Sequence, residues 1–219
     1  MSYIPEPDVV YRPILESLSA GKTPVEEALP PSVKNVRMSL NDVFIKKNRA
    51  FGRAEIYVAS VVTDDISEEP IVTSIKTFEN VKNNEALPLG PSGVAMYRNP
   101  VEGKIPRFID YRILIMESDE GVRQAGTVLE EIRSDSEYKS VSGKLKAAIA
   151  AGNPTAALAM EIGGVVLGIV ARVLKMNRDD QIIYVAGSFD NAFENLGVNH
   201  GVVVQDTKFA TISYQVMAV

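Results

Sequence analysis

The sequence predicts a mainly β protein, an antiparallel β-sandwich of eight strands with one helical unit inserted at residues 119–176. Two observations support this prediction. Apolar and polar side chains alternate with a period of two in short segments before and after the helical unit, as half-buried strands require. Helical periodicity is confined to that one unit, whereas a parallel α/β sheet would place a helix between most pairs of strands.

Residues 1–33 are expected to form a proline-rich arm. They hold six of the twelve prolines of the chain, and each proline fixes φ and removes a backbone donor. A short helix is expected within residues 9–20, because four apolar side chains from Val10 to Leu18 share a helical face. We expect the arm to lie over the main domain, which comprises residues 34–219.

Strands are expected throughout the main domain outside the helical unit. Alternation is clearest at Val36–Leu40 and at Ala54–Val58. The segment between them, Lys46–Gly52, is polar and ends in glycine, which predicts a hairpin. Residues 79–91 and 99–106 are rich in Asn, Gly and Pro and are expected to be loops. The other six strands are expected at Ile71–Phe78, Gly93–Arg98, Phe108–Met116, Ile182–Ala186, Val202–Gln205 and Phe209–Met217.

The helical unit is expected to contain three helices. The apolar period changes to 3.6 from Asp119, whose negative charge suits the first turn of a helix. A polar break at residues 134–136 separates this helix from a second one that ends at Gly152. Asn153 suits the N-cap of a third helix, with Pro154 at its first helical position.

The third helix, residues 153–176, is apolar on nearly every face, so it is expected to be buried in protein or in a membrane. Crossing a membrane takes about 20 apolar residues. Glu161 and Arg172 leave only the ten residues 162–171 uninterrupted, which favours a buried core helix over a membrane-spanning one. Glycines lower helix propensity, which predicts that another backbone packs closely against those at positions 163, 164 and 168.

Composition excludes several kinds of site. The chain has no cysteine and a single histidine, which rules out disulfides, thiolate nucleophiles and a structural zinc site. His200, in an Asn-His-Gly segment, is expected to be an exposed turn residue. The net charge of -5 and the lack of a basic run argue against a nucleic-acid partner. No spacing of residues matches a recognisable reaction, so we do not expect an enzyme.

Acidic residues follow several of the expected strands. Calcium is bound by several oxygen ligands, which loops at one end of a scaffold can supply together. If the loops of this chain meet, their carboxylates could hold such a cation. Carboxylates that cap helices or solvate loops are the alternative interpretation. The candidate metal ligands are Asp64, Asp65, Asp119, Asp179 and Asp180.

The layout of these loops resembles the calcium-dependent, lipid-binding β-sandwich modules of the protein kinase C type. The strand Ala54–Val62, the acidic Thr63–Asp65 and the strand start Pro70–Val72 are similar to the first calcium loop of that family. Ile113–Asp119 and Asp179–Ile182 are similar to the two sides of its later loop, here separated by the helical unit. The resemblance implies a non-enzymatic binding module, with calcium as the cofactor to test.

Three hypotheses for function follow. The first is a binding module that holds a cation or a macromolecule through loops at one end of the sandwich. The second is a structural or self-assembling particle component whose arm reaches a neighbouring subunit. The third is a membrane-active protein that uses residues 153–176 without spanning the bilayer. The start of the chain lacks a basic region followed by an apolar one, so we expect a cytoplasmic protein or export without a classical signal peptide.

Overall fold

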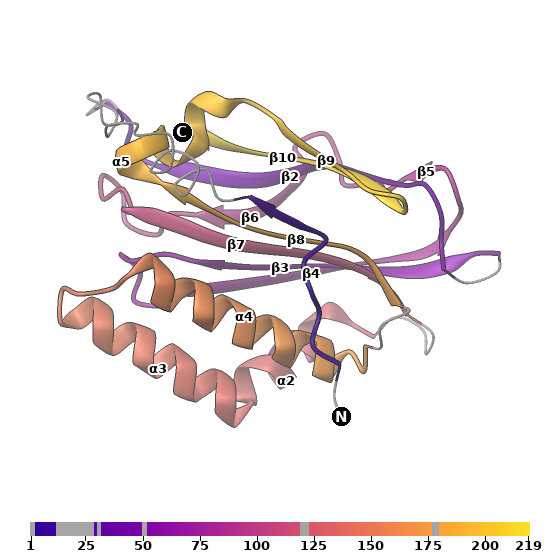
Figure 1. Ribbon diagram of the computed structural model, residues 1–219, viewed down its shortest axis with the longest axis horizontal. Coiled ribbons are helices and arrows are strands. Elements are labelled where there is room, and N and C mark those ends of the chain that lie inside the picture. Colours follow the sequence, from indigo (N-terminus) through magenta and orange to yellow (C-terminus); the bar gives the residue numbers. More distant parts are fainter. Residues whose placement is uncertain (1–2, 12–28, 30–31, 50–51, 119–122, 177–179) are drawn as a thin grey trace.

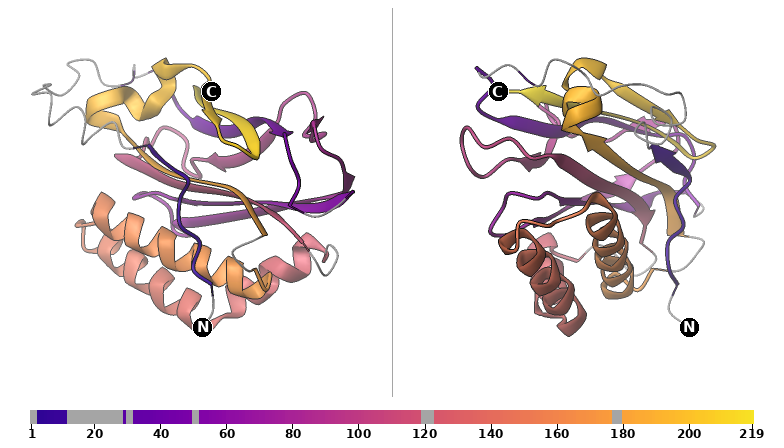
Figure 2. Two further views of the ribbon diagram at one scale, coloured as in Figure 1. Left: turned by 45° about the vertical axis from the view of Figure 1, so that its right-hand side comes forward. Right: turned by 60° about the vertical axis from the view of Figure 1, so that its left-hand side comes forward.

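Three layers make up the fold, two β-sheets and one layer of helices (Figure 1). The computed structural model describes residues 3–11, 29, 32–49, 52–118, 123–176 and 180–219. The two sheets face each other, and the helices cover the outer side of one sheet, as the two views in Figure 2 also show. The protein is therefore mainly β with a helical insertion, as the sequence predicts.

Sheet A is the central layer. Its five strands lie in the order β1-β8-β7-β3-β4, and all neighbours are antiparallel except β1 and β8, which are parallel. The helical unit leaves from β7 and returns to β8, which are adjacent strands. The strands are β1 (Val9–Tyr11), β3 (Ala54–Thr63), β4 (Ile71–Val81), β7 (Phe108–Glu117) and β8 (Gln181–Asp190).

Sheet B is the outer layer. Four of its strands lie in the order β5-β2-β10-β9, and β6 pairs with β2. All of its pairings are antiparallel. The strands are β2 (Val36–Ile45), β5 (Glu85–Ala86), β6 (Val94–Arg98), β9 (Val203–Asp206) and β10 (Ala210–Ala218).

All eight expected strands are present, but the described residues contain ten. One addition is β5, two residues within an expected loop. The other is β1, which occupies the start of the helix predicted for residues 9–20; residues 12–20 lie outside the described part of the chain. Pairing with β8 supplies backbone hydrogen bonds that begin at Asp8, whose N–H donates to the Tyr184 carbonyl at 2.8 Å. Part of the arm is thus a strand of sheet A.

The predicted hairpin between the first two expected strands is wrong. β2 pairs with β5, β6 and β10 in sheet B, whereas β3 pairs with β4 and β7 in sheet A. The polar segment between β2 and β3 therefore crosses from one sheet to the other. Alternation predicts that each segment is a strand, but it does not specify the neighbouring strand.

Three helices cover the outer face of sheet A: α2 (Ala125–Ser134), α3 (Ser136–Ala150) and α4 (Ala156–Val173). The expected burial of the third helix is confirmed on one side, where Val166 and Ile169 lie in the helix–sheet core at 0% and 1% exposure. By length and composition α4 also meets the requirements of a membrane span, with 44% of its residues buried. Its N-cap is Thr155, whose Oγ1 accepts from the Leu158 N–H at 3.1 Å; Asn153 therefore lies before the helix and not at its cap.

The three helix glycines differ in their surroundings. A Cβ at Gly163 would lie 2.9 Å from Asp110 Oδ1, so close packing occurs there, against a side chain of β7. A Cβ at Gly164 or Gly168 would meet nothing within 4 Å, so the packing expected at these two positions is not made by described residues. Both line a shallow hollow of about 350 Å³ beside Ile4.

Two short helical segments follow sheet A: α5 (Asn191–Glu194) and the 3-10 helix η2 (Asn195–His200). They connect the end of β8 to β9 and pack against β8 and β10.

Candidate functional site

Asp64, the first candidate metal ligand, is committed to internal hydrogen bonds. It is 1% exposed and follows β3 directly. Its Oδ1 accepts from the N–H groups of Ile66 at 3.0 Å and Ser67 at 2.9 Å. Its Oδ2 accepts from the Tyr97 hydroxyl at 2.7 Å and from the Ser67 hydroxyl. The carboxylate therefore closes the β3–β4 loop and ties it to β6.

Asp65 is committed in the same way. It is 7% exposed, and it accepts from the Arg107 N–H at 2.8 Å and from Arg107 Nε at 2.6 Å. These contacts tie the β3–β4 loop to the segment before β7. The oxygens of both aspartates are used within the fold, which is the capping interpretation of acidic loop residues.

The candidate ligands that the structure describes do not meet. Thr63, next to Asp64, pairs with Asp110 at one end of sheet A, whereas Gln181, next to Asp180, pairs with Met116 at the other. The ten residues of β8 separate these ends by about 30 Å, at about 3.3 Å per residue. Asp119 and Asp179 lie outside the described residues. Within the described part of the chain, no three Asp, Glu or His residues are grouped as a metal site requires.

A pocket of about 530 Å³ lies where α2 and α3 pack beside the start of β4, and the sequence did not predict it. Residues from the helices supply most of its lining, and the rest comes from one residue of the β3–β4 loop, Glu69, and the first residue of β4, Ile71. The lining residues are Glu69, Ile71, Arg133, Tyr138, Lys139, Ser142, Gly143 and Lys146.

Two hydroxyl groups of this pocket have unused hydrogen-bonding capacity. Tyr138 and Ser142 are 8% and 7% exposed, one helical turn apart on α3. Neither hydroxyl forms a hydrogen bond with another described residue, and neither is shut off from solvent. Both therefore open into the pocket. Burial raises the pKa of the Tyr138 hydroxyl, with Arg133 opposing the rise and Glu69 adding to it. The hydroxyl stays protonated near neutral pH and can donate.

The pocket is positively charged although the chain is net negative. Three cations line it, Arg133, Lys139 and Lys146, against one carboxylate, Glu69. Lys146 Nζ lies 2.6 Å from Glu69 Oε1, so these two charges offset each other. Arg133 and Lys139 are exposed and form no ion pair within the described part of the chain. Two cations and two hydroxyl donors thus share one pocket.

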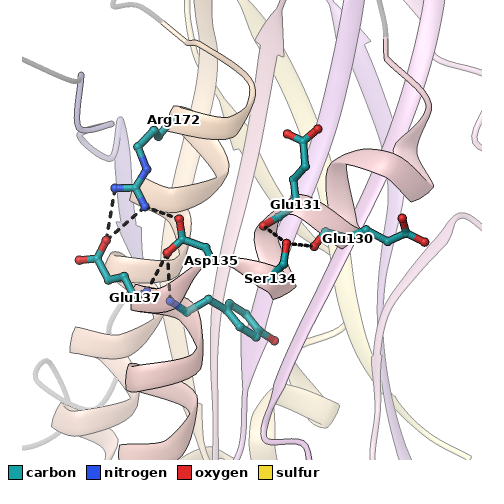
Figure 3. A network of polar contacts seen from close by, with 7 residues as sticks. Glu130, Glu131, Ser134, Asp135, Glu137 and Arg172 are labelled. Carbon is teal, nitrogen blue, oxygen red and sulfur yellow. Dashed lines mark hydrogen bonds and ion pairs between the residues drawn. The ribbon is translucent and has the colours of Figure 1, made fainter.

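The junction of α2 and α3, which holds the pocket residues at a fixed angle, is itself held by the network in Figure 3. Asp135 Oδ1 caps α3 by accepting from the Glu137 N–H at 2.8 Å. Its Oδ2 accepts from Arg172 of α4 at 2.8 Å, and Arg172 also contacts Glu137 at 3.3 Å. The Ser134 hydroxyl donates back to the Glu130 carbonyl at 2.7 Å and closes α2. Arg133 and Tyr138 flank this junction, so its geometry positions both.

His200 is exposed at the end of η2, as the sequence predicts, but its ring also contacts two residues that are distant or not adjacent in sequence. Its Nδ1 lies 2.9 Å from the Tyr11 hydroxyl, and its Nε2 lies 3.6 Å from Glu194 Oε2. Burial lowers the pKa of His200. Tyr11 comes from the arm, so no local sequence pattern could have placed it beside the histidine.

Comparison with known proteins adds no assignment. No protein-family model matches the chain, and no curated protein matches its sequence. Any functional interpretation therefore rests on the site geometry.

Proposed function

We propose that this protein is a non-enzymatic binding module that takes the anionic group of a ligand into the pocket between α2, α3 and β4. The observation that supports it is the pair of buried hydroxyls, Tyr138 and Ser142, which have no hydrogen-bond partner among the described residues and open beside two cations, Arg133 and Lys139, that form no ion pair with those residues either. Buried polar groups are normally hydrogen-bonded, so unused donors in a cavity favour a ligand that supplies acceptors.

The chemistry of the lining selects an oxyanion. Arg133 offers a planar fork of N–H donors that suits carboxylate and phosphate, and Lys139 adds a point charge. The hydroxyls of Tyr138 and Ser142 can donate to further oxygens. Ile71 and Gly143 provide apolar wall for the body of the ligand. A volume of about 530 Å³ lies within the range of about 300–1,000 Å³ typical of small-molecule sites.

Binding without reaction fits the same lining. The Ser142 hydroxyl has no hydrogen bond to a base within the described residues, whereas a nucleophilic serine is activated by a neighbouring base. Lys146, one helical turn after Ser142 on α3, is paired with Glu69, and within the described residues Lys139 forms no hydrogen bond to the serine. The pocket is suited to holding an anion in place.

The first test is a titration with inorganic phosphate that follows the thermal unfolding midpoint. A ligand that binds only the folded state at tenfold its Kd stabilises it by about 1.4 kcal/mol. For a chain of this size that raises the midpoint by roughly 3–5 °C. Phosphate also stabilises proteins generally by exclusion from their surface, so the comparison between variants decides the outcome.

The decisive variant is Arg133→Ala with Lys139→Ala, which removes both unpaired cations of the pocket. Its matched control is Lys47→Ala with Lys144→Ala, which removes two exposed cations elsewhere. We expect the saturable part of the phosphate effect to persist in the control and to vanish in the pocket variant. An equal phosphate effect in both would show a general salt effect and refute the proposal.

A further inference from the structure

The arm is joined to the opposite end of the chain through one histidine. Tyr11 is the last residue of β1, and its hydroxyl lies 2.9 Å from His200 Nδ1 in η2. Its ring lies against Phe189 of β8, with centroids 5.5 Å apart. The same residue pairs with Gly187 in the parallel register of β1 and β8. Tyr11 therefore anchors the end of β1 to both β8 and η2.

A buried carboxylate completes the chain of contacts. Glu194 is 8% exposed; its Oε2 lies 3.6 Å from His200 Nε2 and its Oε1 accepts from the Asp190 N–H at 2.9 Å. Aromatic rings surround this part of the fold: Phe189 stacks on Tyr111 at 5.1 Å, and His200 meets Phe189 edge-on at 6.1 Å. If the Glu194 carboxylate ionises, it loses hydration in these surroundings, and among the described residues His200 and the Asp190 amide are the polar groups that replace it.

Glu194 and His200 lie on the consecutive segments α5 and η2, whose backbone follows an unusual path. Asn195 and Leu196 have positive φ angles of 51° and 54°, which cost energy for residues with a side chain. Gly197 also has positive φ, and a Cβ there would lie 2.6 Å from the Phe189 ring. The chain can follow this path only because position 197 lacks a side chain, and the path places Glu194 against His200.

The charges around the pair set its protonation. Burial raises the pKa of Glu194 to about 7; the hydrogen bond from the Asp190 amide opposes the rise, and the Asp190 charge adds to it. Burial raises the pKa of Asp190 as well, and Asp65, itself paired with Arg107, contributes. Burial lowers the pKa of His200. The other groups that face the pair are the phenols of Tyr11, Tyr111 and Tyr214, which are neutral near pH 7.

We propose that Glu194 and His200 form a proton-controlled latch that holds the Tyr11 end of β1 on β8. In the latched state the pair carries one proton and no net charge, the form that the aromatic surroundings accept. Losing that proton leaves an uncompensated carboxylate, and gaining a second leaves an uncompensated imidazolium. This inference does not depend on the proposed function, because the latch and the pocket share no residue.

The direction of the pH dependence follows from the two shifts. A carboxyl group with a raised pKa stabilises the latched state fully below its ordinary value of 4.5, and this contribution is lost as the pH rises to about 7. A histidine with a lowered pKa stabilises the latched state above its ordinary value of 6.5 and loses this contribution as the pH falls. The ionisation of Glu194 therefore weakens the latch as the pH rises toward about 7, and the His200 contribution opposes this loss only below 6.5.

The test uses a tryptophan reporter on β1. The chain contains no tryptophan, and Val10 is 48% exposed on this strand, so Val10→Trp adds a single reporter without disturbing the core. Acrylamide quenching measures how often the reporter leaves the sheet. Ionisation of Glu194 around pH 7 changes the equilibrium by up to about tenfold between pH 6 and pH 8, and the lowered pKa of His200 opposes part of this change, so we expect the open population to rise by up to about tenfold over that range.

Two variants in the reporter background identify the groups. Glu194→Gln keeps the shape but cannot ionise, so its quenching should not rise above neutral pH. Glu79→Gln, an exposed carboxylate on β4, should behave like the parent. Constant quenching in the parent, or the same alkaline rise in Glu194→Gln, would overturn the latch.

A third variant covers the case in which Glu194→Gln does not fold. Tyr11→Phe keeps the ring against Phe189 and removes only the hydroxyl that contacts His200. Its quenching should exceed that of the parent at about pH 6 and change less with pH. Quenching identical to the parent at every pH would contradict the proposal.

Discussion

Replacing Asp64 by asparagine distinguishes a structural carboxylate from a calcium ligand. The substitution keeps the size of the side chain and removes its charge. In the folded protein the carboxylate accepts from two backbone N–H groups, from the Tyr97 hydroxyl and from the Ser67 hydroxyl. Asparagine can keep its oxygen toward the amides, but its NH₂ group then faces two hydroxyl donors.

The expected cost follows from these four bonds. Hydrogen bonds to a charged acceptor contribute about 1.5–3 kcal/mol each and neutral ones about 1 kcal/mol. Weakening two bonds and disrupting two removes roughly 4–6 kcal/mol, and relief from burying a charge returns part of it. We therefore expect Asp64→Asn to lower the free energy of unfolding by about 3 kcal/mol, which lowers the melting temperature by roughly 6–12 °C.

The assay is thermal unfolding of the parent and of Asp64→Asn, each with calcium and with chelator. The structural role predicts the same loss of stability in both conditions. Asp42→Asn, at an exposed carboxylate of β2 that accepts a hydrogen bond from the Ser213 hydroxyl at 3.0 Å, serves as the control and should change the melting temperature little. A variant as stable as the parent in chelator, and less stable only with calcium, would refute this reasoning and restore the calcium site.

Two further predictions concern α4. Gly163→Ala should lower the free energy of unfolding by about 1–3 kcal/mol, because its Cβ would lie 2.9 Å from Asp110 Oδ1. Gly164→Ala, at an open position of the same helix, should raise it by up to about 1 kcal/mol. Chemical denaturation measures both changes, and equal effects of the two substitutions would contradict the packing. Val166→Asp should prevent soluble folding, since its side chain is fully buried among apolar groups, and normal melting of the purified variant would show that this face is not core.

The sequence predicted strands well because a period of two is a local feature of extended chain. Val36–Leu40 lies in β2, with Val36, Met38 and Leu40 in the core between the sheets. Ala54–Val58 lies in β3, which is buried on both faces, since Ile56 and Val58 face the other sheet and Tyr57 faces the helices. That pattern does not specify which strands pair, and the predicted hairpin is wrong for this reason. β1 was missed because its partner, Val185–Gly187, is far away in the sequence, whereas helical spacing is a local signal.

The acidic residues illustrate why composition alone misleads about sites. Asp64 stands three residues before Ser67, a spacing that suits a side chain capping its own loop, but the contact from Tyr97 exists only in the folded chain. The sequence contains part of the information for the pocket, because the four-residue spacing of Tyr138 and Ser142 places them on one face of α3. Glu69 reaches that face only through the packing of the helices on sheet A.

Mapping phosphate binding by amide NMR shifts tests the central claim most directly. We expect saturable shifts that are largest at the amides of Arg133, Tyr138, Ser142 and Gly143. Gly143→Leu, which fills the pocket from an open position, should abolish them, and Gly126→Leu, equally open but on α2 outside the pocket, should not. Shifts that are confined to the cations near β9 and β10, such as Lys46 and Lys208, or that never saturate, would contradict a binding site between the helices and sheet A.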